Sequence, residues 1–112
     1  MKVRALPDRP DRVRVLQAWG EMDLTVVPAV VAGLQDLVAG APAVVLDLSA
    51  VSFFDSSGVR LVDQLARICG GAGAAFRVAA PPESAGRRVL EIVGMGALLT
   101  DTLGAAVSEV RP

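Results

Sequence analysis

The pattern of hydrophobic and polar positions predicts a first strand over residues 13–20, VRVLQAWG. Apolar positions alternate loosely there, and the β-branched residues favour extended backbone. Successive side chains of a strand point to opposite faces. Val13, Val15 and Trp19 would therefore share one face, and Leu16 and Ala18 would share the other.

A helix is predicted next, over residues 27–39. Its apolar positions follow the i, i+3, i+4, i+7 spacing of one buried stripe, and they are Val27, Val30, Val31, Leu34, Leu37 and Val38. Thr25 suits the cap of this helix and Pro28 its first turn. Gly40 and Pro42 are expected to end it.

The rest of the chain continues the alternation. Residues 43–48, AVVLDL, form a short apolar run that is typical of a strand covered on both faces. Residues 57–69 predict a helix on the spacing of Val59, Val62, Leu65, Ala66 and Cys69, ended by Gly70, Gly71 and Gly73.

Three further elements complete the prediction. Residues 74–79, AAFRVA, indicate a strand, and residues 83–94 a helix whose apolar side would carry Val89, Leu90, Ile92 and Val93. The tail from 98 to 110 is expected to hold a short strand and a last helix. This order predicts an α/β fold, with a mainly parallel sheet of four to five strands and helices packed on it. We expect one domain over residues 1–112.

The composition indicates a core built mainly from aliphatic side chains, because hydrophobic residues make up 53% of the chain and aromatic residues only 4%. The formal net charge of -1 gives no electrostatic basis for binding nucleic acid or an anionic membrane. The N-terminal stretch from Met1 to Arg14 has no apolar segment of a signal peptide. No run approaches the roughly 18 apolar residues of a membrane span. We therefore expect a cytoplasmic protein without membrane insertion.

The chain contains no histidine and one cysteine, Cys69. A Ser-His-Asp or Cys-His catalytic site is therefore impossible within one chain, and no internal disulfide can form. Cys69 stands in an apolar stretch, so we interpret it as a small core or helix-end residue rather than a catalytic thiol. The chain contains neither of the two glycine-rich nucleotide-binding motifs, Gly-x-x-x-x-Gly-Lys-Ser/Thr and Gly-x-Gly-x-x-Gly. We expect no enzyme activity, no cofactor and no metal.

The most informative segment is LDLSAVSFFDSSGVR, residues 46–60. We expect a strand to end near Leu48, and Phe53 and Phe54 to anchor the following loop in the core. The sequence Asp55-Ser56-Ser57-Gly58 then leads into a helix. Asp and Ser suit a helix cap, and the N-terminus of a helix also tolerates an added phosphate. Without further information, a simple helix cap is enough to explain the sequence Asp55-Ser56-Ser57-Gly58.

Three blocks of sequence resemble the STAS-domain family, in particular its stand-alone anti-sigma factor antagonists. The first is Gly20-Glu21-Met22-Asp23, similar to the family's Gly-Glu-Leu-Asp at the end of an early strand. The second runs from Leu46 to Gly58 and includes the Asp-Ser-Ser-Gly switch. The third is RRVLEIVGM, residues 87–95. The resemblance covers a core of about residues 12–110.

The resemblance implies a phosphorylation switch in sigma factor regulation by partner switching. The phosphorylated residue of the family maps to Ser56, with Ser57 as the alternative. The unphosphorylated protein would bind a cognate anti-sigma factor, itself a serine kinase, and so release the sigma factor. Phosphorylation would block this binding, and a phosphoserine phosphatase would reverse it.

The expected partner-binding residues surround this switch. The list comprises Trp19, Glu21, Asp23, Asp55, Ser57, Gly58 and Arg60. Asp23 and Asp55 would lie near Ser56 if the first strand ends beside the switch loop, although turn formation explains both equally well. Arg60 departs from the family pattern and would lie near the switch. For Trp19, core packing is the favoured interpretation and an interface anchor the alternative.

Two other functions remain open. STAS domains also serve as scaffold subunits of stressosomes and as regulatory subunits of lipid or anion transport systems. A strand–loop–helix junction can also hold the phosphates of a nucleotide, but the missing glycine-rich motifs argue against that function.

Overall fold

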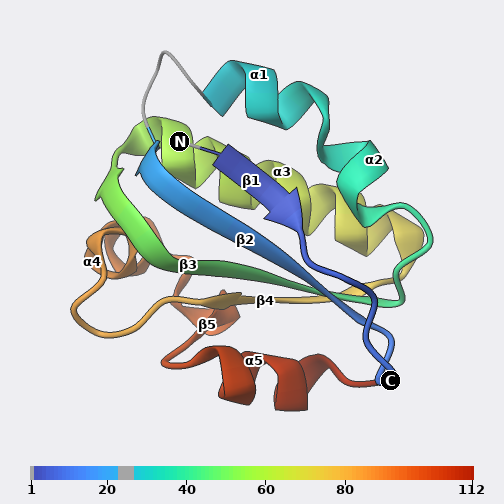
Figure 1. Ribbon diagram of the computed structural model, residues 1–112. Coiled ribbons are helices and arrows are strands. Elements are labelled where there is room, and N and C mark those ends of the chain that lie inside the picture. Colours follow the sequence, from blue (N-terminus) through green and yellow to red (C-terminus); the bar gives the residue numbers. More distant parts are fainter. Residues whose placement is uncertain (1, 23–26) are drawn as a thin grey trace.

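The fold is built on a five-stranded sheet with the order β1-β2-β3-β4-β5 (Figure 1). The computed structural model describes residues 2–22 and 27–112. Strands β2 to β5 are parallel, and β1 is antiparallel to β2. The strands are β1 (Lys2–Ala5), β2 (Val13–Met22), β3 (Ala43–Phe54), β4 (Ala75–Ala79) and β5 (Leu99–Thr100). The expected α/β fold with a mainly parallel sheet is confirmed.

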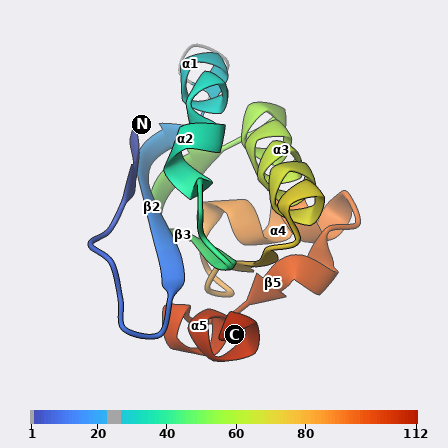
Figure 2. The same ribbon diagram turned by 90° about the vertical axis from the view of Figure 1, so that its right-hand side faces the viewer.

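Helices cover both faces of this sheet, unequally. In the described residues they are α1 (Val27–Ala32), α2 (Leu34–Val38), α3 (Ser56–Ala72), α4 (Ala85–Ile92), a short 3-10 helix η1 (Gly96–Leu98) and α5 (Leu103–Val110). The larger apolar cluster joins the sheet to α1–α4. The smaller one joins the other face to α5, which lies alone on that side (Figure 2).

The two faces of β2 agree with the alternation in its sequence. Leu16 and Ala18 belong to the larger cluster, and Val13 and Val15 to the smaller one. Trp19 is not in the core, contrary to the favoured interpretation. Its side chain is half-buried, and the guanidinium of Arg4 lies 5.2 Å from its ring centroid.

Strand β1 has no counterpart in the sequence prediction. Its residues are mostly exposed, and only Val3 packs against the larger cluster. A four-residue edge strand with one apolar contact leaves no hydrophobic period to recognise. Backbone pairing with β2, in which Lys2 lies opposite Trp19, places it in the sheet.

The helix predicted over 27–39 is two short helices. Gly33 separates them, and its N–H donates to the carbonyl of Val30 at 3.1 Å, a bond of the tighter 3-10 type. The apolar stripe still faces the core, because Leu34 and Val38 are buried while Val30, Val31 and Leu37 pack against the cluster. Thr25, the expected cap, lies outside the described residues.

The two helices after β3 also differ from their predicted bounds. Helix α3 runs through Gly70 and Gly71 to Ala72, and Gly73 ends it at a φ of 71°. Gly70 and Gly71 are helical, and the helix ends at the glycine whose φ is positive, a conformation that favours glycine. In α4, only Leu90 of the predicted apolar side is buried; Ile92 and Val93, at its end, are 72% and 50% exposed.

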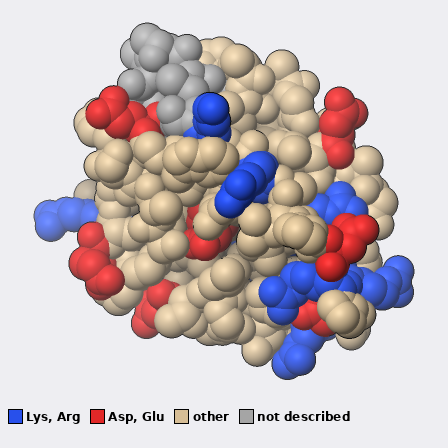
Figure 3. All heavy atoms as spheres, viewed as in Figure 1, with Lys and Arg blue, Asp and Glu red and all other residues tan. Residues whose placement is uncertain are grey.

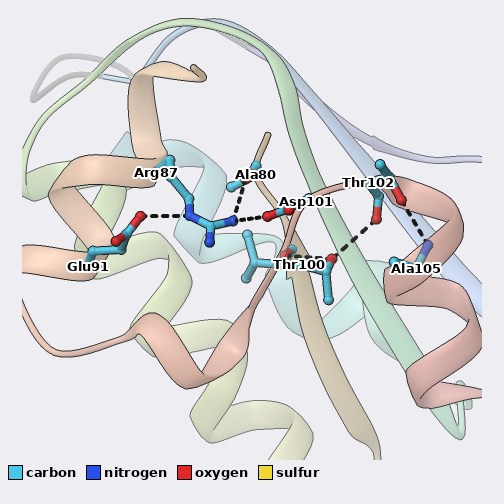
Figure 4. Close-up of polar contacts among 8 residues, drawn as sticks. Ala80, Arg87, Glu91, Thr100, Asp101, Thr102 and Ala105 are labelled. Atoms are coloured by element: carbon cyan, nitrogen blue, oxygen red, sulfur yellow. Dashed lines mark hydrogen bonds and ion pairs between the residues drawn. The ribbon is translucent and has the colours of Figure 1, made fainter. Parts of the chain in front are cut away.

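Helix α4 is held against the sheet by Arg87 (Figure 4). Its guanidinium donates to the carbonyl of Ala80 at 2.9 Å and to Asp101 at 2.8 Å. It also donates to Glu91, one turn further along α4, at 2.7 Å. These bonds connect α4 to the end of β4 and to the turn that precedes α5.

Candidate functional site

The predicted switch lies where β2 and β3 end together. Met22 pairs with Phe54, and Glu21 pairs with Phe53. Strand β3 therefore does not end near Leu48, as the sequence suggested, but continues to Phe54. At two register shifts in this pairing, after Gln17 and after Gly20, β3 carries one residue more than β2, and the pairing with β2 continues to Phe54.

Asp55 connects this strand end to α3 as the cap of the helix. Its side chain accepts a hydrogen bond from the N–H of Ser57 at 2.8 Å. Its carbonyl accepts bonds from the N–H groups of Gly58 and Val59, at 3.0 and 3.2 Å. The bonds from Ser57 and Gly58 satisfy N–H groups that a helix start leaves free, and the bond from Val59 is the first regular bond of the helix. The predicted capping role of Asp55 is confirmed.

The two serines of the motif lie in different surroundings. Ser56 is the first residue of α3, and its side chain is exposed. Ser57 is 7% exposed and packs into the molecule. Of the two, only Ser56 presents its hydroxyl to another protein without a change in the helix.

The ring of Phe54 leaves no room for a side chain at position 58, where the chain has glycine. A β-carbon on Gly58 would lie 2.6 Å from that ring, and one on Gly86 of α4 would lie 3.1 Å from it. The ring is thus enclosed by the first turns of α3 and α4. Gly58 is a packing residue at the start of α3, and Gly86, absent from the predicted site, has the matching role on α4.

Phe53 does not anchor the loop in the core, because it is 48% exposed. Neighbouring residues of a strand point to opposite faces, so the burial of Phe54 turns Phe53 outward. It lies opposite the exposed Glu21, two residues before Asp55. An exposed phenylalanine beside a predicted interface is a further candidate contact.

The other predicted site residues are spread around this edge. Arg60 is exposed in the second turn of α3. Trp19 lies farther back, opposite Ala50 of β3. Asp23 lies outside the described residues. The structure therefore brings Glu21, Asp55 and Ser56 to one edge and places Trp19 away from it.

Cys69 lies near the opposite end of α3 from the switch. It is 1% exposed, as expected of a core residue, and burial raises the pKa of its thiol to about 11. Within residues 2–22 and 27–112, no group of acidic, histidine or cysteine side chains is arranged to hold a metal ion. None of the described helices has the length and apolar character needed to cross a membrane.

A family model described as "Mlab, STAS domain" matches residues 5–100. The chain belongs to the STAS-domain family. A search of curated proteins finds no match.

Several solved structures share this fold. An anti-sigma factor antagonist from Mycobacterium paratuberculosis is 31% identical, with a TM-score of 0.80 over 99% of this chain and 96% of that chain. The anti-sigma factor antagonist SpoIIAA in its unphosphorylated form is 23% identical, with a TM-score of 0.80 over 98% of this chain and 96% of that one. A variant of RsbS from Moorella thermoacetica is 20% identical, with a TM-score of 0.75 over 98% and 95%. The last two support the fold alone.

Proposed function

We propose that this STAS domain, taken as one domain over residues 1–112, is an anti-sigma factor antagonist with Ser56 as its switch. In the unphosphorylated state it binds a cognate anti-sigma factor with serine kinase activity, which releases the sigma factor in the cytoplasm. Phosphorylation of Ser56 by that kinase prevents binding, and a phosphoserine phosphatase restores it. The chain is a substrate and a binding partner in this scheme, and it does not contact nucleic acid.

The observation that carries the proposal is the exposure of Ser56 at the start of α3, beside the buried Ser57. The partner supplies the nucleotide and the catalytic base, which fits a chain without histidine. The 31% identity to an anti-sigma factor antagonist over nearly the whole chain supports the same role.

A phosphate on Ser56 is expected to act at the interface and not on the fold. The positive end of the α3 dipole stabilises an anion by up to about 1 kcal/mol. The carboxylates of Asp55 and Glu21 oppose it, so the net change in stability is small. A desolvated like-charge contact across the interface costs several kcal/mol, and ~4 kcal/mol corresponds to about a thousandfold weaker binding.

Binding titrations with the cognate anti-sigma factor test this proposal. Ser56→Asp is expected to weaken binding strongly while the melting temperature changes little, and Ser56→Ala is expected to bind constitutively. Asp63→Asn, at a half-buried position two turns along α3, is a control for a charge change on the same helix. A Ser56→Asp protein that binds as tightly as the wild type, or that unfolds, would refute the mechanism.

A second function keeps the fold but changes the partner. The chain matches a model of the STAS domain as such, and STAS domains also serve in stressosomes and in lipid or anion transport systems. Purification from the native cell discriminates the two: a membrane permease or a stable large oligomer favours the second function, and an anti-sigma factor favours the first.

A further inference from the structure

A groove of about 810 Å³ lies near the far end of α3 from Ser56. Helix α2, the loop into β3 and the last turns of α3 form its walls, and Figure 2 faces this side of the molecule. Its lining is mainly apolar and includes Val38, Pro42 and Ile68. Gly71, in the groove, comes fifteen residues after Ser56 on the same helix, a rise of about 22 Å. The groove is therefore separate from the switch.

Gly71, in the wall of this groove, is not required by packing within the chain. A β-carbon on Gly71 would meet nothing within 4 Å, in contrast to Gly58 at the other end of the same helix. Glycine inside a helix is less favourable than alanine. Any larger side chain at position 71 would extend into open space beside the groove and narrow it.

A second, cationic pocket of about 230 Å³ adjoins the groove. The two share Gly40, Ala41 and Pro42 in their walls. Arg9, Arg12 and Arg14 line the second pocket, together with Asp8. Figure 3 shows Lys and Arg side chains, with Asp and Glu side chains among them, over the β1–β2 loop and the C-terminal end of the chain.

The three arginines differ in how they are engaged. Arg9 pairs with Asp11 at 2.9 Å. Arg14 donates to the carbonyls of Leu37 and Ala39, at 3.0 and 3.1 Å, and so binds the end of α2. Arg12 is exposed, forms no ion pair with another described residue, and has a φ of 64°. A non-glycine residue in this strained conformation is uncommon and is often found at a binding site.

We propose that the groove and the cationic pocket together bind an anionic amphiphile, with a single aliphatic chain in the groove and a carboxylate at Arg12. The volume of the groove is within the roughly 300–1,000 Å³ of small-molecule sites. Its apolar walls gain from the burial of an aliphatic chain, and a guanidinium forms charge-assisted hydrogen bonds with a carboxylate. This site does not depend on the proposed switch function.

Titration of the 15N-labelled protein with decanoate, below its micelle concentration, tests the site by NMR. We expect saturable shifts of the amides of Gly40, Ala41 and Gly71, and no shift at Ser56. Gly71→Leu places a larger side chain in the wall of the groove, at a position where the β-carbon itself meets no atom within 4 Å, and is expected to weaken binding at least about tenfold. Arg12→Gly relieves the positive φ and removes the charge, so it is expected to weaken decanoate about tenfold and decan-1-ol hardly at all.

Two control variants carry equivalent changes away from the groove. Gly104→Leu adds the same side chain on α5, where a β-carbon also meets nothing within 4 Å, and Arg88→Ala removes an exposed charge from α4. Both are expected to bind decanoate as the wild type does. The proposal is overturned if decanoate does not saturate, if the shifts map elsewhere, or if Gly71→Leu or Arg12→Gly binds decanoate with unchanged affinity.

Discussion

At the scale of single residues, the ring of Phe54 determines which side chains fit at the start of α3. Gly58→Ala would place a β-carbon 2.6 Å from that ring. We expect the variant to lose about 1–3 kcal/mol of unfolding free energy, as overpacked cores do. Urea unfolding measures this loss.

The matched control is Gly70→Ala, near the other end of α3. A β-carbon there meets nothing within 4 Å, so the better helix propensity of alanine should stabilise the protein by about 0.5–1 kcal/mol. Equal effects of the two substitutions would show that Phe54 does not restrict position 58.

The chemistry of individual residues was more predictable than their exposure. The capping role of Asp55 follows from its residue type and its place before a helix. The difference between Ser56 and Ser57 depends on how α3 sits against the sheet, which no local pattern contains. For Phe53 and Phe54 the prediction was half wrong, because their opposite directions require that the strand continue past Leu48.

At the scale of elements, Arg87 connects α4 to the end of β4 and to the turn that precedes α5. Arg87→Ala removes the partner of the Ala80 carbonyl and the bond to Asp101. We expect a loss of about 1–3 kcal/mol, the cost of leaving such groups unpaired. Arg88→Ala, an exposed neighbour on the same helix, should remain within about 0.5 kcal/mol of the wild type. Thermal unfolding of both variants decides whether Arg87 has this role.

Most elements with a regular hydrophobic spacing and a buried face were predicted close to their place in the chain. The strand at β4 and the final strand and helix were predicted in order and approximate position. Strand β1 was missed because it has one apolar contact. The end of β3 and the break at Gly33 were missed because strand pairing and a local 3-10 bond, rather than hydrophobic spacing, determine them.

At the scale of the whole molecule, the buried Cys69 makes stability fall in alkaline solution. Its pKa is raised from 9.0 to about 11 in the folded state, so the folded state holds its proton more tightly than the unfolded one. Its stabilising effect is complete below about pH 9 and declines as the pH rises towards 11, by about 2–3 kcal/mol in total. The unfolding free energy of the wild type and of Cys69→Ala is measured by urea unfolding at several pH values between 8 and 11. The effect of Cys69 is the difference between the two proteins in how steeply this free energy falls with pH. Parallel slopes would contradict it.

The central claim concerns the behaviour of the whole molecule: phosphorylation of one hydroxyl, that of Ser56, decides whether the protein binds its anti-sigma factor. The most direct test is incubation of the wild type, Ser56→Ala and Ser57→Ala with the cognate anti-sigma kinase and ATP, followed by mass mapping of the phosphate. We predict phosphate on Ser56 in the wild type and in Ser57→Ala, and none in Ser56→Ala. Phosphate on Ser57 of the wild type, or undiminished phosphorylation of Ser56→Ala, would contradict the account.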